Sequence, residues 1–133
     1  MFGALNSLKP NAHWLLRIAV ASVFLFHGMG KASSIGSFAQ MVDIPYIVAA
    51  LVTFAELAGG IGLIVGRFKS DLITRLAGLA IAPVMLGAII MVHWGRWSFT
   101  PAEGYPIGGM EFQVVLMLAG LYFLIVGNSK LAD

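Results

Sequence analysis

The stretch LAGLAIAPVMLGAIIMV, residues 76–92, contains no charged side chain over its whole length. A helix needs roughly 20 mostly apolar residues to cross the hydrocarbon core of a bilayer. The apolar character of this stretch extends over about residues 72–94, which is long enough to do so. Three further segments have a similar length and composition, at about 12–30, 46–66 and 111–127. The sequence therefore predicts four membrane-spanning helices.

The overall composition supports the same conclusion. Of the 133 residues, 59% are hydrophobic and 11% are charged, and the mean hydropathy is +0.92. A soluble domain carries about 25% charged residues, so this chain cannot cover its surface with polar groups. We expect an all-α, integral membrane four-helix bundle formed by a single domain over residues 1–133. The basic residues are scattered and form no stripe, so nucleic acid is not an expected partner.

Two other features of the sequence limit the possibilities. The chain has no cysteine, which excludes disulfides and thiolate metal sites within it. Its first apolar segment is a poor match to a cleaved signal peptide, because Arg17 interrupts the apolar region and His27 stands where cleavage requires small neutral residues. We therefore expect the first helix to be retained in the membrane.

The distribution of Lys and Arg predicts the orientation of the chain. Cytoplasmic loops of membrane proteins are enriched in these residues. The basic residues near the termini and the 67–71 turn are Lys9, Arg17, Arg67, Lys69, Arg75 and Lys130, whereas the opposite side carries only Lys31 and Arg96. This bias predicts that both termini are cytoplasmic and that residues 31–45 and 95–110 lie outside. We expect the membrane to be a bacterial inner membrane. Apolar residues at helical spacing in 31–45 also predict a short amphipathic helix on that surface.

Two charged residues lie within the predicted spans. Glu56 is ten residues from either end of its segment and so lies near the midplane, where an unpaired carboxylate is costly. Arg17 lies within about two turns of the cytoplasmic end of the first helix. It can extend toward water or pair with Glu56. Such a pair would either fix the helix packing or form part of a polar ligand site, and the sequence leaves both interpretations open.

Three titratable groups are predicted to lie at similar depth near the outer ends of three helices: His27, His93 and Glu111. Together with Arg17 and Glu56, they are the candidate ligand-binding residues. An imidazole can donate a hydrogen bond to a quinone carbonyl, and a carboxylate can exchange its proton. Two imidazoles and a carboxylate can also bind a metal, but the spacing forms no metal motif. A quinone is therefore the favoured ligand, and neither a metal nor a bis-histidine haem is expected. Lys31 is expected to extend to the outer surface.

Three motifs resemble those of a known family. RIAVASVFLFHGMGK (17–31) resembles the first-helix motif of the DoxX family, and FAELAGGIGLIVGRF (54–68) resembles its second-helix motif. GGMEF (108–112) resembles the start of its fourth helix. The resemblance extends from about residue 15 to residue 127 and implies a small four-helix membrane protein. Because the family takes its name from a subunit of a thiosulfate:quinone oxidoreductase, the resemblance also implies a link to quinone or oxidative-stress responses.

Three functions remain open at this point. The first is a redox-linked subunit that supplies a quinone-type site or anchors a partner oxidoreductase. The second is a non-catalytic scaffold in which the buried charges fix the packing of the helices. The third is a small-solute carrier, for which the sequence shows no inverted repeat. Partner subunits and a homo-oligomer are both compatible with the long apolar faces of such a bundle.

Overall fold

A computed structural model describes residues 2–128, and all the regular elements in this range are helical. Two short elements precede the bundle, α1 (Gly3–Asn6) and the 3-10 turn η1 (Lys9–Asn11). The four main helices are α2 (His13–Ala32), α4 (Tyr46–Lys69), α5 (Asp71–Ala88) and α6 (Glu111–Val126). The π-helical turn η2 (Ile89–His93) continues α5, and α3 (Ile35–Val42) connects α2 to α4.

Helices occupy all four predicted segments, and the connections differ in detail. The predicted short helix within 31–45 is α3. The predicted 67–71 turn is reduced to Ser70, because α4 continues to Lys69 and α5 begins at Asp71. The Ser70 side chain caps α5 by accepting a hydrogen bond from the Leu72 backbone N–H at 3.1 Å. Lys130, which contributed to the predicted orientation, lies outside the described residues.

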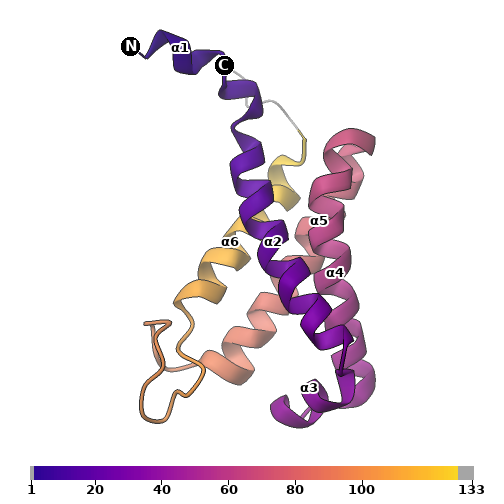
Figure 1. Cartoon of the computed structure of the whole chain (residues 1–133), viewed down its shortest axis with the longest axis vertical. Coiled ribbons are helices and arrows are strands. Elements are labelled where there is room, and N and C mark those ends of the chain that lie inside the picture. The colour runs from indigo at the N-terminus through magenta and orange to yellow at the C-terminus, as the bar shows by residue number, and fades with distance from the viewer. Residues whose placement is uncertain (1, 129–133) are drawn as a thin grey trace.

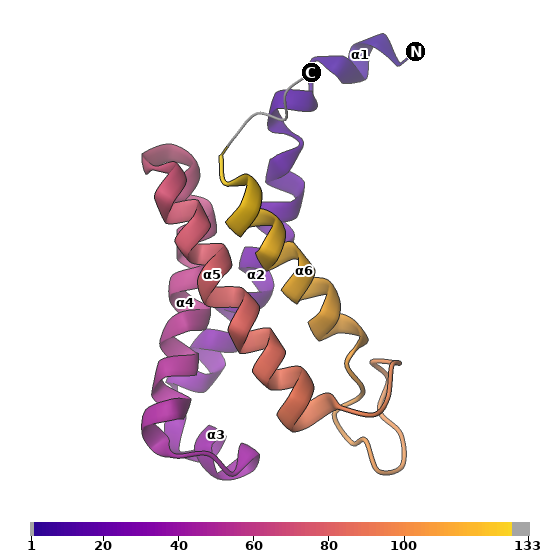
Figure 2. The same cartoon turned by 180° about the vertical axis from the view of Figure 1, so that it is seen from behind.

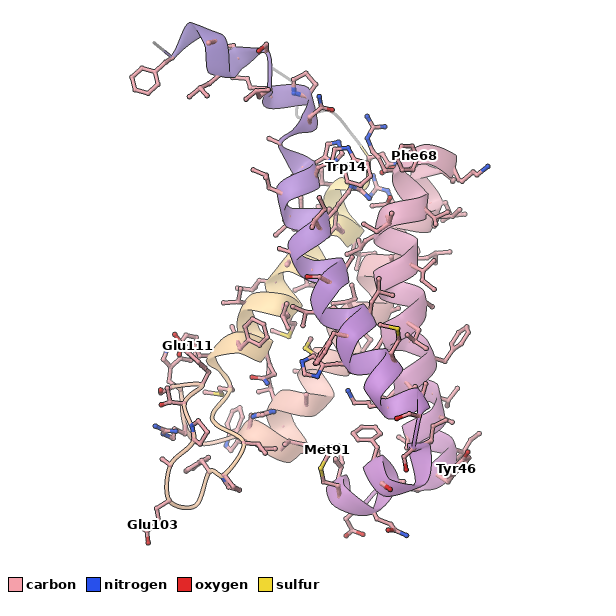
Figure 3. All side chains as sticks on the ribbon, viewed as in Figure 1. Trp14, Tyr46, Phe68, Met91, Glu103 and Glu111 are labelled. Atoms are coloured by element: carbon pink, nitrogen blue, oxygen red, sulfur yellow. The ribbon has the colours of Figure 1, made fainter. Side chains whose placement is uncertain are left out.

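The helices converge at one end of the bundle and spread at the other (Figure 1). α5 packs against both α4 and α6, and α2 packs against α4. At the spread end, α3 and the adjoining ends of α2 and α4 lie on one side, and the 94–110 loop lies on the other (Figure 2). We call this the α3 end. At the convergent end, the rings of Trp14 and Phe68 pack together with centroids 5.4 Å apart (Figure 3).

The lengths and surfaces of the helices fit a bilayer. Three spans are long and apolar enough to cross a membrane: Lys9–Ala32, Tyr46–Lys69 and Asp71–His93. The apolar α6 is shorter, and its 16 residues are about 24 Å long. Large apolar side chains cover the outward faces of these helices, among them Leu15, Phe54, Leu118 and Ile125. In water such a surface would be an aggregation hazard, but it suits contact with lipid. The three long apolar spans and this surface together indicate that the chain is a multi-pass membrane protein.

The core depends on close approach of the backbones. Its largest apolar side chains, Phe24, Leu63, Ile81 and Phe123, come from four different helices. Gly78 of α5 lies directly against the backbone of α6, where an added methyl group would overlap the Gly120 carbonyl oxygen. Small residues at helix contacts in lipid allow this kind of packing.

Replacing Gly78 with alanine should therefore push α5 and α6 apart. We expect the free energy of unfolding to fall by about 1–3 kcal/mol, as for other overpacked interiors. Gly87→Ala in the same helix is the matched control, because an added methyl group there meets no atom within 4 Å. That control should be neutral or slightly stabilising. Unfolding in mixed detergent and SDS micelles measures both variants, and equal losses would show that the α5–α6 contact is not tight.

Candidate functional site

A buried ion pair joins α2 to α4 near the α3 end. The Lys31 Nζ atom lies 2.8 Å from Oε2 and 3.0 Å from Oε1 of Glu56. The Glu56 side chain is 4% exposed and that of Lys31 is 20% exposed. Gly28 and Gly60 let the two helices approach closely enough for this contact, since a methyl group at either position would collide with a leucine of the other helix. The Lys31 ammonium also lies 5.1 Å from the ring centroid of Phe38 in α3.

Of the two alternatives that the sequence left open for Arg17, neither is found: Glu56 pairs with Lys31 instead, and Arg17 is 1% exposed and so does not extend into water. The expectation that Lys31 extends to the outer surface is wrong. Gly28 packs against Leu57 and Gly60 against Leu25, so α2 and α4 run antiparallel. In this register, the start of α2 lies beside the end of α4, which separates Arg17 from Glu56. Lys31 falls within α2, which continues to Ala32, and its side chain turns into the bundle.

Arg17 instead forms a polar cluster at the convergent end. Arg17 as a whole is 1% exposed. Its guanidinium donates hydrogen bonds to the Leu63 carbonyl of α4, to Thr74 Oγ1 of α5 at 3.2 Å and to Asn128 Oδ1 at 2.7 Å. The Phe123 ring of α6 lies 5.0 Å from the guanidinium carbon. We call Arg17, Thr74 and Asn128 the Arg17 cluster. It connects α2, α4 and α5 to the end of α6.

Further contacts strengthen this end of the bundle. Asn128 Nδ2 donates to the Gly66 carbonyl at 2.8 Å, and Arg75 donates to the last carbonyls of α6, including Ile125 O at 2.6 Å. Helix C-terminal carbonyls have no partner within their own helix, so these side chains supply one. His13 lies between two arginines, with Arg17 Nε at 3.1 Å and Arg67 Nε at 3.0 Å from its ring nitrogens. A neutral imidazole has one acceptor nitrogen, so it accepts from one arginine at a time.

A cavity of about 760 Å³ occupies the α3 end, on the same side of the bundle as the ion pair. This volume lies within the range of about 300–1,000 Å³ that is typical of small-molecule sites. Its walls are mostly apolar and come from α2, α3, α4, α5, η2 and α6. The polar or titratable side chains among the lining residues are His27, Lys31, Glu56, His93 and Gln113.

A second cavity, of about 670 Å³, lies against the corner between α2 and α3. It shares four lining residues with the first, namely His27, Lys31, Phe38 and Met41. His27 and Lys31 are four residues apart on α2, so they lie on one face of that helix. The two side chains therefore border both cavities.

His93 and Gln113 form a polar contact on another part of the cavity wall. His93 is the last residue of η2 and is 9% exposed. Its Nδ1 lies 3.0 Å from the Gly108 carbonyl oxygen, and its Nε2 lies 3.0 Å from Gln113 Nε2 of α6. π-helical turns occur frequently at functional sites.

The predicted site residues are thus divided between three places. His27, Glu56 and His93 line the cavity, whereas Arg17 lies at the other end of the bundle. Glu111 begins α6 beside the 94–110 loop (Figure 3), where its carboxylate accepts from the Phe99 backbone N–H at 3.2 Å.

Sequence reasoning did not place Lys31 or Gln113 on the wall of a cavity, where the structure has both. Two signals were available in the sequence. Lys31 follows His27 by four residues, and Gln113 is an amide side chain in the apolar segment 111–127. Residues 2–128 contain no group of three or more His, Cys, Asp or Glu side chains placed to hold a metal.

Comparisons with known proteins identify the family but no individual relative. No curated protein and no solved structure matches the chain. The sequence model described as DoxX matches residues 12–94, which run from the residue before α2 through η2 and include the ion pair and His93. The match covers more than half of the chain, although it ends before GGMEF and α6. This chain, with its apolar helices and its two buried polar centres, belongs to the DoxX family.

Proposed function

We propose that this protein binds a quinone-type ring in the cavity at the α3 end, as the membrane component of a redox system. The observation that carries the proposal is the buried Lys31–Glu56 pair on the wall of a large apolar cavity. An apolar cavity with a few converging polar groups is the usual form of a small-molecule site. Ionisable groups within membrane spans most often serve function, because they are costly to keep there.

The lining residues suit the two ends of such a molecule. The Lys31 ammonium has three N–H donors, so it can donate to a quinone carbonyl while remaining paired with Glu56. Reduction of a quinone to a quinol consumes two electrons and two protons. Glu56 and His27 are groups that can hold and release protons. Several lining residues, including Leu51 and Met91, are also exposed on the outer surface, which leaves a path for an apolar tail into the lipid.

The electrons are proposed to come from a partner oxidoreductase, because the chain has no cysteine to carry a thiol–disulfide couple. We further propose that the protein lies in a bacterial inner membrane and that both termini face the cytoplasm, which is the orientation that the Lys and Arg bias predicts. The cavity would then open on the outer half of the inner membrane. A redox partner that reaches the bound ring directly would accordingly be found on that side.

Quinone binding can be tested by filling the cavity without altering its polar groups. Gly87 lines the cavity, and an added side-chain atom there meets open space. We expect Gly87→Phe to weaken binding of decylubiquinone at least tenfold, because the new ring occupies the ligand volume. Leu86→Phe on the exposed face of α5 is the matched control and should bind as the wild type does. Isothermal titration calorimetry in detergent micelles measures the affinities.

Two results would count against this function. If the wild type binds no quinone above its partition into micelles, the scaffold function is left as the better account of the buried charges. If Gly87→Phe and Leu86→Phe bind equally well, the quinone binds elsewhere on the protein.

A further inference from the structure

We propose that the convergent end of the bundle binds the phosphate group of an anionic membrane lipid, at the corner between the start of α2 and the end of α4. Two side chains form this corner, His13 of α2 and Arg67 of α4, and the Nε2 atom of His13 lies 3.0 Å from the Nε atom of Arg67. Both residues are partly exposed. This corner is at the opposite end of the bundle from the cavity, so the inference does not depend on quinone binding.

The hydrogen-bonding groups at this corner do not match one another. Arg17 and Arg67 each direct an Nε–H group at a ring nitrogen of His13, at 3.1 Å and 3.0 Å. A neutral imidazole has one nitrogen that accepts and one that carries a hydrogen. One of the two contacts therefore sets two N–H donors against each other. A protonated ring would do so at both contacts, because both of its nitrogens are donors.

Burial decides which of the two contacts lacks an acceptor. Arg17 is 1% exposed, so its Nε–H cannot turn to water, and His13 is its partner. An unpaired buried donor is costly, so we assign the accepting nitrogen, Nδ1, to the contact with Arg17. Nε2 of His13 then carries the hydrogen and faces the Nε–H of Arg67. An oxygen atom that accepts from both groups would remove this conflict.

The charges around this corner favour an anion as the source of that oxygen. The two salt bridges found within residues 2–128 involve neither Arg17 nor Arg67. The described residues provide one hydrogen-bond partner for the Arg67 guanidinium, which is His13, and they leave its two terminal nitrogens open to solvent. A guanidinium binds two oxygens of a phosphate in a bidentate arrangement. Arg67 can therefore hold a phosphate that also accepts from His13.

The aromatic surface beside the corner favours a lipid over a soluble anion. The Trp14 ring lies 5.5 Å from the His13 ring and 5.4 Å from the ring of Phe68, which follows Arg67 in α4 (Figure 3). Phe68 is 74% exposed, so an acyl chain can lie along it while the phosphate lies at Arg67. Basic pockets between membrane helices are typical sites for anionic headgroups. Phosphatidylglycerol fits better than phosphatidylcholine, because choline would bring a further cation to this corner.

The fluorescence of Trp14 can report which lipid occupies the corner. Trp94→Phe combined with Trp97→Phe leaves Trp14 as the one tryptophan, and both replaced residues are exposed at the α3 end. This two-tryptophan variant is reconstituted into phosphatidylcholine vesicles that contain a fixed fraction of lipid with brominated acyl chains, which quench tryptophan. The brominated lipid is either phosphatidylglycerol or phosphatidylcholine. Measurement in 1 M salt, where the Debye length is about 3 Å, screens the attraction of exposed charges.

We expect brominated phosphatidylglycerol to occupy the corner about tenfold more strongly than brominated phosphatidylcholine in this background. That ratio is what one hydrogen bond to a charged group provides. Adding Arg67→Met should abolish the preference, because the variant lacks the guanidinium donors. Lys69→Met is the matched control, since it removes one positive charge from an exposed position two residues along α4. That control should keep the preference.

Arg67→Gln provides a second variant if the methionine variant does not fold. Glutamine removes the charge and keeps a polar side chain, and the same loss of preference is expected. A preference that persists in either Arg67 variant would overturn the inference, because another group would then hold the headgroup.

Other outcomes would also contradict a lipid site at this corner. If the background protein shows no preference between the two lipids, the corner binds no anionic headgroup. If Arg67→Met and Lys69→Met lose the preference equally, the attraction is diffuse and no specific site exists. If inorganic phosphate releases the brominated phosphatidylglycerol, and sodium chloride at equal ionic strength does not, the corner binds soluble phosphate rather than a lipid.

Discussion

Replacing Arg17 with methionine should lower the free energy of unfolding by about 3 kcal/mol or more. The Arg17 guanidinium donates hydrogen bonds to groups on α4 and α5 and to Asn128 just after α6. The residue as a whole is 1% exposed. A hydrogen bond to a charged group contributes about 1.5–3 kcal/mol, and several are lost together. Methionine retains the apolar stem, so the loss reports on the polar contacts rather than on packing.

Lys69→Met is the matched control for this prediction. It also removes one positive charge near the convergent end, but from an exposed position. Unfolding in SDS and detergent mixtures should place this variant within about 0.5 kcal/mol of the wild type. If Arg17→Met is as stable as Lys69→Met, the Arg17 cluster does not hold the convergent end together.

The second large effect is expected at the ion pair. Lys31→Met leaves the Glu56 carboxylate, which is 4% exposed, without its cation. Removing one partner of a buried pair costs about 3–5 kcal/mol, because the remaining charge stays desolvated. Glu56→Gln should cost less, since the longer Lys31 side chain is 20% exposed and can turn its ammonium toward the cavity mouth. We therefore predict a marked asymmetry between the two single variants.

A double variant separates the cost of an unpaired charge from the value of the pair. Lys31→Met combined with Glu56→Met replaces both charges by apolar groups, and such replacements are often neutral or stabilising. We expect it to recover most of the stability that Lys31→Met loses. A double-mutant cycle from unfolding measurements gives the coupling energy directly. Additive losses would mean that the two side chains do not interact in the membrane.

The composition of the sequence was sufficient to predict the helices. An uncharged stretch such as 76–92 has few alternatives to a membrane-spanning helix, so the observed bounds lie close to the predicted ones. The connection at Ser70 was less predictable. A basic run such as 67–69 is compatible both with a turn and with the end of a helix, and here α4 continues through it.

The partners of the buried charges could not be predicted in the same way. Depth in the membrane made Arg17 and Glu56 plausible partners, but pairing depends on the register between two helices. That register is fixed by the contacts of Gly28 and Gly60. Placing Lys31 beyond the helix end also removed it from consideration, although α2 extends two residues beyond the predicted end.

The wall of the cavity depends on a local irregularity that the sequence does not reveal. The π-helical turn η2 ends at His93, whose ring bonds both the Gly108 carbonyl and Gln113. Nothing in the run IIMVH distinguishes a π-helical turn from an α-helical one. The contact between His93 and Gln113 also spans the 94–110 loop, so it follows from tertiary structure and not from spacing.

Photolabelling of the wild-type protein in membranes with an azidoquinone tests the central claim most directly, because it locates the bound ring without any substitution. We expect saturable labelling, displaced by excess decylubiquinone, at cavity-lining residues in 48–56 of α4 and 80–92 of α5 and η2. Label that is not displaced, or that is confined to exposed side chains at the convergent end such as Leu15 and Ile125, would contradict a quinone-type site at the α3 end.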